Sequence, residues 1–180
     1  MKKILYLLTI VLCSTAFISC DDEWGNDNSA MEHVYYFGFQ EWGHAKNDLV
    51  YNVDRNSTVE IPMQFWCEFV RSYNVDTYYY LAGELKRGID YEVVDENGNI
   101  LSPDANGAFT FTWEKAIKGI KMIYIKALNA NTGSLIVQTF NPNSDVELSN
   151  QDVSSTIQNK TQDYEVRIFT QNYMAKVNVK

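Results

Sequence analysis

The feature that most constrains the fold is the strict alternation of apolar and polar residues between positions 59 and 69. One set of alternate positions is apolar (Val59, Ile61, Met63, Phe65, Cys67 and Phe69), and the set between them is mostly polar (Glu60, Pro62, Gln64, Trp66 and Glu68). A period of two residues predicts a β-strand with one buried and one solvated face. Because Pro62 has no N–H to donate, the pattern predicts an edge strand or a bulge there.

Similar patterns indicate strands along most of the chain, at 34–39, 49–53, 75–81, 91–95, 109–113, 135–140, 164–168 and 173–179. The run 120–128 is apolar on both faces of a strand, which predicts a central strand.

Asn97-Gly98 and Asn106-Gly107 predict tight turns, because both residue types adopt positive φ at low cost. Residues 113–121 are too short for more than a turn, and 141–162 read as a long loop with one strand at most, in which Ile157 is expected to be buried. About nine strands with so little helix predict an all-β, antiparallel sandwich.

The N-terminus has the shape of a secretory signal. Lys2 and Lys3 precede an apolar run from 4 to 18, which is too short to span a bilayer permanently. The run is followed by Ser19 and Cys20. The four residues Phe17-Ile18-Ser19-Cys20 resemble the lipobox of bacterial lipoproteins. That resemblance implies cleavage before Cys20 and attachment of a diacylglyceryl group to its sulfur and an acyl chain to its nitrogen; the alternative is an ordinary signal peptide with an incidental cysteine.

The residues after Cys20 bear on location. Asp21, Asp22 and Glu23 resemble the acidic export signal of lipoproteins displayed on the outer face of the outer membrane, although a solvated acidic linker is the alternative. The expected organisation is a signal peptide at 1–19, a flexible acidic tether at 20–32 and a single sandwich domain at 33–180. Loss of the two signal lysines takes the formal net charge from −8 to −10, which argues against nucleic acid as a partner.

Only Cys67 remains as a thiol once Cys13 leaves with the signal and Cys20 carries lipid. No disulfide can form within the mature chain, so its core must stabilise the fold alone.

Four segments together resemble the order of motifs in Calx-beta domains, which are immunoglobulin-like sandwiches. They are 59–65, the Gly-Ile-Asp-Tyr corner at 88–91, Phe-Thr-Phe at 109–111 and the run 118–123. The acidic, calcium-contacting stretch of that family has no counterpart, because 126–133 contains no carboxylate. The whole chain also resembles small lipoproteins of glycan-utilisation systems of the starch-utilisation type, which implies a place at the cell surface.

No catalytic or metal-binding signature is present. His33 and His44 lack metal-ligand spacing and are expected on the surface. Asp90, Asp95 and Glu96 could supply a carboxylate pair for glycoside hydrolysis, but turn carboxylates ordinarily cap backbone N–H groups. A calcium loop starting at Asp95 would need Glu at its twelfth position, which holds Asn106, so a hairpin turn is expected. We expect no enzyme activity, no cofactor and no metal.

The remaining signal is aromatic. The strand register places Trp66 outward, and Trp42 and Tyr79 are further candidates for ligand binding, since an exposed ring can stack against a sugar. The other interpretation of Trp66 is an indole covered by a loop. Two functions stay open: a surface-tethered binding module for glycan, or a structural or assembly subunit such as an adhesin, a fimbria-like component or an accessory lipoprotein of an outer-membrane transporter.

Replacement of Cys20 tests the anchor. A Cys20→Ala variant should be released from membranes or accumulate as an unprocessed precursor, because lipid would have no sulfur to attach to. Membrane fractionation and mass spectrometry of the mature N-terminus measure this. Normal processing and full membrane retention would contradict the assignment.

Overall fold

The two ends of the chain provide neighbouring strands in both sheets of the computed structural model. The structure describes residues 31–40, 47–128, 130–144 and 155–180. These contain eleven strands: β1 (Val34–Phe39), β2 (Leu49–Val53), β3 (Thr58–Trp66), β4 (Val75–Gly83), β5 (Tyr91–Val94), β6 (Phe109–Trp113), β7 (Gly119–Ala127), β8 (Gly133–Gln138), β9 (Ser155–Lys160), β10 (Glu165–Phe169) and β11 (Met174–Val179). A single 3₁₀ turn, η1 (Glu114–Ala116), joins β6 to β7.

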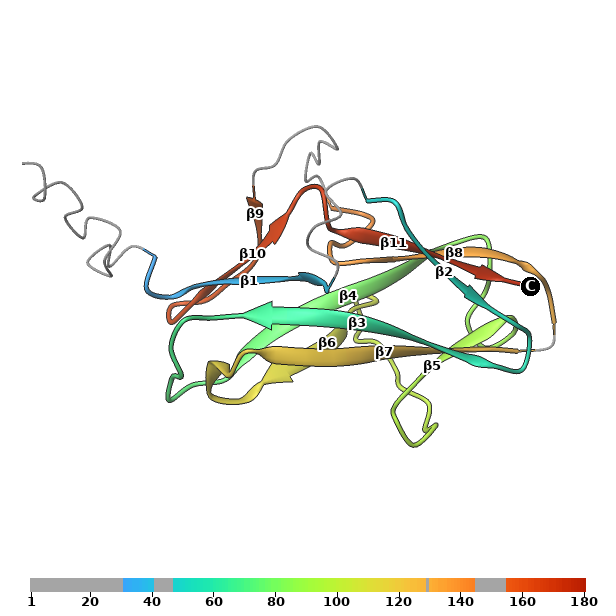
Figure 1. The fold of residues 1–180 in the computed structure, drawn as a ribbon, viewed down its shortest axis with the longest axis horizontal. Coiled ribbons are helices and arrows are strands. Elements are labelled where there is room, and N and C mark those ends of the chain that lie inside the picture. Colours follow the sequence, from blue (N-terminus) through green and yellow to red (C-terminus); the bar gives the residue numbers. More distant parts are fainter. Residues whose placement is uncertain (1–30, 41–46, 129, 145–154) are drawn as a thin grey trace, which may run out of the picture. The chain divides into compact units, whose positions relative to one another are not determined.

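The strands form two sheets that pack as a sandwich (Figure 1). The first sheet has the order β5-β7-β3-β1-β10-β9, and the second has the order β2-β11-β8-β4-β6. The expected all-β sandwich is confirmed. Most neighbours are antiparallel, but β1 pairs with β10 and β2 with β11 in parallel, so each sheet is mixed.

The chain divides into two units, 1–33 and 34–180, and all eleven strands belong to the second. Of the first unit the structure describes Met31–His33, which form a turn with exposed side chains. The signal, Cys20 and the acidic tether lie outside the described residues. Within the described ranges, no helix is long and apolar enough to cross a membrane.

The alternating faces of β3 are confirmed over most of their length. Ile61, Met63 and Phe65 are fully buried, and Cys67 directly after the strand is 3% exposed. The prediction for Phe69 was wrong, because β3 ends at Trp66 and the Phe69 side chain lies outside the sheet, 43% exposed.

The position of Pro62 also differs from expectation, because β3 is a central strand between β7 and β1. The Pro62 carbonyl accepts a hydrogen bond from the backbone N–H of Gln40 (3.0 Å), one residue beyond the end of β1. The N and C=O of one strand residue point to the same side, so the missing N–H of Pro62 falls where pairing with β1 stops. The proline thus costs only one hydrogen bond of the ladder between β3 and β1, at the point where β1 ends.

The strand β9 was not located by the sequence, and Ile157 within it is 40% exposed rather than buried. Its polar side chains bond to the backbone of β4, whose pairing with β8 covers only Tyr80–Gly83. Gln158 accepts from the N–H of Tyr78 (3.1 Å) and donates to its carbonyl (2.8 Å), and Asn159 donates to the Asp76 carbonyl (3.0 Å). These amides satisfy backbone groups that a neighbouring strand would otherwise pair.

A buried carboxylate joins the loop before β5 to the loop after β7. Asp90 is 4% exposed, accepts from the backbone N–H of Lys86 (2.7 Å) and accepts from Asn131 Nδ2 (2.7 Å). The hydrogen bond from the Lys86 N–H, followed by that from Asn131, holds the pKa of Asp90 below its ordinary value.

We expect this carboxylate to make stability pH-dependent. A lowered pKa means that the folded state favours the charged form, so the contribution is present above about pH 4 and is lost as the pH falls further. Asp90→Asn should lower the urea midpoint at pH 7, and its difference from the unmodified protein should shrink at pH 3.

The exposed Asp54 provides the control, since its side chain makes no such contacts among the described residues. Asp54→Asn should leave both midpoints unchanged. A deficit for Asp90→Asn that is equal at the two pH values would contradict this role.

Candidate functional site

The clearest candidate site is a row of three side chains across the outer face of the first sheet. Trp66 on β3 lies opposite Tyr36 on β1, which in turn lies opposite Arg167 on β10. We call these three residues the aromatic row. Phe169, two residues beyond Arg167, stacks on Tyr36 with ring centroids 5.1 Å apart and an interplanar angle of 9°. The row therefore presents the exposed indole of Trp66 beside a tyrosine ring that Phe169 holds in place.

Alternation along the strands forces these side chains outward. Phe65 and Cys67 on either side of Trp66 are buried, while the Trp66 side chain is 39% exposed. Tyr35 and Phe37 are likewise buried around the half-buried Tyr36. The predicted outward position of Trp66 is confirmed.

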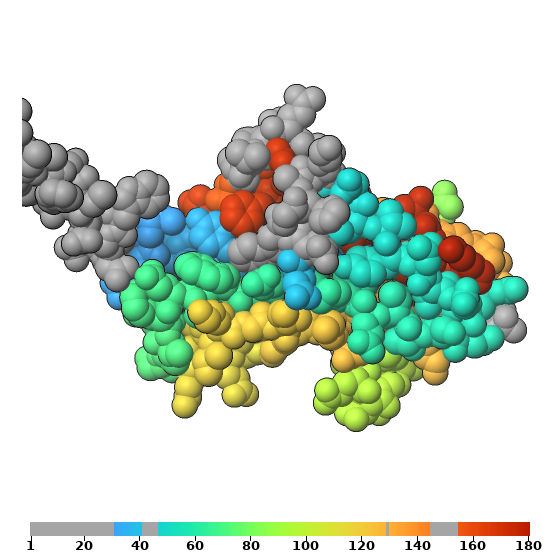
Figure 2. Space-filling view, viewed as in Figure 1, coloured from blue at the N-terminus to red at the C-terminus, as the bar shows by residue number. Residues whose placement is uncertain are grey.

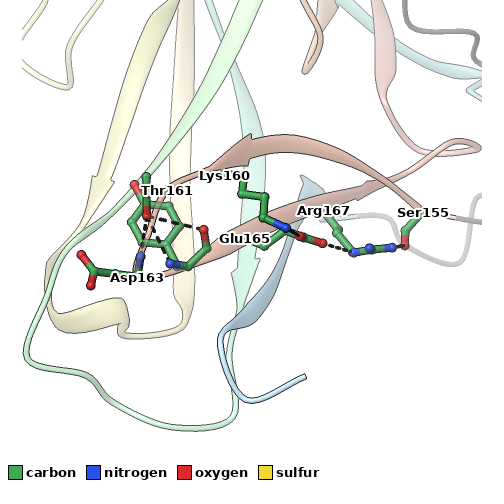
Figure 3. Close-up of polar contacts among 7 residues, drawn as sticks. Ser155, Lys160, Thr161, Asp163, Glu165 and Arg167 are labelled. Carbon is green, nitrogen blue, oxygen red and sulfur yellow. Dashed lines mark hydrogen bonds and ion pairs between the residues drawn. The ribbon is translucent and has the colours of Figure 1, made fainter. Parts of the chain in front are cut away.

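The β9–β10 hairpin carries further charged side chains beside Arg167 (Figure 3). Glu165 accepts from Arg167 Nε (2.6 Å) through one carboxylate oxygen and from Lys160 Nζ (2.8 Å) through the other. Arg167 Nη1 also lies 3.4 Å from the hydroxyl oxygen of Ser155. Each of the three charged groups is thereby oriented toward its neighbours.

The hydrogen bond from Lys160, together with that from Arg167, lowers the pKa of Glu165 against the opposing effect of desolvation. Glu165 is consequently ionised at neutral pH and acts only as a hydrogen-bond acceptor. A general acid for glycoside cleavage needs the opposite shift, toward a protonated carboxyl.

The prediction for Tyr79 was wrong. Its side chain is 2% exposed and stacks on Phe109 inside the sandwich, with ring centroids 5.1 Å apart. Burial raises the pKa of its phenol. The inward residues of β4 share the parity of Val75, so Tyr78 and Tyr80 are the half-buried tyrosines of the opposite face. Trp42, the remaining candidate, lies outside the described residues.

Sequence reasoning missed the other two members of the row. The outward direction of Tyr36 could have been predicted, because Tyr36 lies between Tyr35 and Phe37 of the buried face. The position of Arg167 could not, since it depends on the parallel pairing of β1 with a strand about 130 residues later in the chain. Similarly, Asp76 is a charged residue at an alternate position to the apolar Val75. Because Tyr78 and Tyr80 lie two and four residues after Asp76, they could have been assigned to the outer face with it.

The carboxylates considered for catalysis have structural contacts. Asp90 holds the loops described above, and Asp95 accepts from the backbone N–H groups of Asn97 (2.9 Å) and Asn99 (2.8 Å) in its own turn. Gly98 has φ of +83°, as the predicted turn requires. His33 is exposed, as expected, and His44 lies outside the described residues. No group of three metal-ligating side chains occurs in the described part of the chain.

No protein-family model matches the chain, and no curated protein matches it. A function for the chain is therefore argued from the residues described above.

Proposed function

We propose that the protein is a non-catalytic lipoprotein, anchored through Cys20 to the outer face of the outer membrane, that binds glycan through the aromatic row. The observation that carries this proposal is the exposed indole of Trp66 on the outer face of the first sheet, in one row with Tyr36 and Arg167. The signal-like N-terminus and the acidic residues that follow Cys20 support the location.

The chemistry of the row suits a sugar. The C–H face of a pyranose stacks on an indole, and we expect a gain of the size that pairs of aromatic rings give, about 0.5–1.5 kcal/mol beyond the area they bury. The fixed Glu165 carboxylate accepts hydrogen bonds from hydroxyl groups, and Arg167 and Gln64 donate to sugar oxygens. Gln64 is half-buried two residues before Trp66 on the same face of β3.

The shape of the site agrees with binding rather than hydrolysis. The row lies on the open face of a sheet, and the carboxylate beside it is held ionised by two cations. A chain segment of a polysaccharide can lie across such a face without being enclosed. Tethering by lipid would keep the bound polymer at the cell surface.

Replacement of the indole tests the proposal. Native gels cast with soluble plant and fungal polysaccharides should retard the unmodified protein with at least one of them. Trp66→Ala should weaken that binding about tenfold, and Trp66→Phe should retain part of it because a smaller ring can still stack.

Val50→Ala is the matched control, because Val50 is an exposed apolar residue (53%) on β2 of the other sheet. This variant should bind like the unmodified protein, and all variants should show similar thermal unfolding. Unchanged binding by Trp66→Ala would exclude the row as the site. Binding to none of the polysaccharides would instead favour the structural or assembly role.

A further inference from the structure

A notch opens at the edge of the sandwich, on the other side of β3 from β1. Figure 2 shows it at the lower margin, between the yellow-green loop that follows β5 and the yellow residues around the start of β7. Its volume is about 440 Å³, and its apolar lining comes from Val94, Leu101, Phe111, Ile120, Met122 and Tyr124. We call it the edge notch.

The first half of β7 has no neighbouring strand on this side within the described residues. Pairing with β5 ends at Val94 opposite Tyr124, because the chain turns away at Asp95 and returns to pair Ile100 with Val94. The partner strand therefore covers Tyr124–Ala127 of β7 and leaves the stretch from Gly119 to Ile123 uncovered.

The direction of the uncovered backbone groups follows from the ladder. Ala127 bonds through its N–H and its C=O to the chain before β3, and the N–H of Leu128 bonds to Asp90 on the β5 side. Alternation along an antiparallel strand then directs the N–H and C=O of Ile120 and Met122 toward the edge notch. Two donors and two acceptors at strand spacing are complementary to one extended backbone.

A cation lies between these two residues. Lys121 points inward, where its Nζ donates to the Thr112 carbonyl (2.5 Å) and lies 5.1 Å from the centre of the Trp113 ring. Within the described ranges no carboxylate pairs with this ammonium group. An inward side chain with a carboxylate, placed opposite Lys121, would supply the missing charge.

We propose that the edge notch binds an extended peptide segment of a partner protein, which adds to β7 as a strand. The segment would carry apolar residues beside Ile120 and Met122 on the outer face and one acidic residue facing inward to Lys121. Asp95 and Glu96 on the opposite wall repel an acidic tract, so a single acidic residue among apolar ones fits best.

A second copy of this chain fits less well. Each copy has a formal net charge of −8 as the full sequence, or −10 without residues 1–19, so two copies repel each other. Two β7 edges related by a two-fold axis at Lys121 would also place the two ammonium groups opposite each other. The loop between β5 and β6 also projects beside this edge of the sandwich, where a second sheet would have to approach (Figure 1).

The test uses acetylated, amidated peptides and the full chain observed by ¹H–¹⁵N NMR. The probe has the sequence Thr-Val-Glu-Val-Thr, and its counterpart has Lys in place of Glu. In the free protein the amides of Ile120 and Met122 should exchange rapidly with solvent. The probe should shift both signals and slow their exchange, and the Lys peptide should bind about two- to fivefold more weakly.

Two variants separate backbone pairing from non-specific contact. Met122→Pro removes an N–H that has no strand partner among the described residues. The fold should therefore tolerate the substitution, as edge strands tolerate proline, and peptide binding should be lost. Lys121→Glu should reverse the preference between the two peptides. Methylation of the valine nitrogens in the probe should abolish binding without any change to the protein.

Three outcomes would overturn the proposal. The first is the absence of shifts at Ile120 and Met122 with millimolar probe. The second is equal binding of the N-methylated probe. The third is protection of the same amides that rises with protein concentration in the absence of peptide, which would assign the edge to a second copy.

Discussion

The stacking of Phe65 on Trp113 joins the two sheets of the sandwich. Their ring centroids are 4.9 Å apart and their planes are 15° from parallel, although Phe65 belongs to β3 and Trp113 to β6 of the other sheet. The Trp113 indole also donates to the Thr77 hydroxyl (2.9 Å), so its position is fixed through β4 as well. Cys67, the cysteine among the described residues, forms no disulfide, so buried contacts such as this one hold the sheets together.

The two candidate surfaces follow from that contact. If Phe65 faces inward, Trp66 must face outward, because successive strand residues point to opposite faces. The same register of β3 sets that of β7, where Ile123 is buried while Ile120 and Met122 remain exposed. The aromatic row and the edge notch thus lie at different places of one sheet and derive from one choice of register.

Much of this arrangement could be predicted from local pattern. The alternation in β3 and the two Asn-Gly turns are properties of short segments, and each was readable. The central position predicted for 120–128 holds only for Tyr124–Ala127, which lies between β5 and β3, because β5 is too short to cover the first half of β7. The parallel pairings of β1 with β10 and β2 with β11 depend on residues more than 120 positions apart, which no local period encodes. The strand β9 was missed because it pairs with β10 but carries amide side chains that bond to the backbone of β4, so its polar sequence resembles that of a loop. Tyr79 was misassigned because three consecutive tyrosines show no alternation of apolar and polar residues. The alternation is visible only at Val75 and Asp76, earlier in the strand.

The reactivity of neighbouring thiols tests the register most directly. In a chain lacking residues 1–19 and carrying Cys20→Ala, Cys67 should react with a thiol reagent only upon unfolding, because it is buried and burial raises its pKa. A cysteine introduced by Trp66→Cys, with Cys67→Ala, should react in the folded protein orders of magnitude faster. Rapid labelling of Cys67 with protection at position 66 would mean that β3 is shifted by one residue, and that the indole lies in the core.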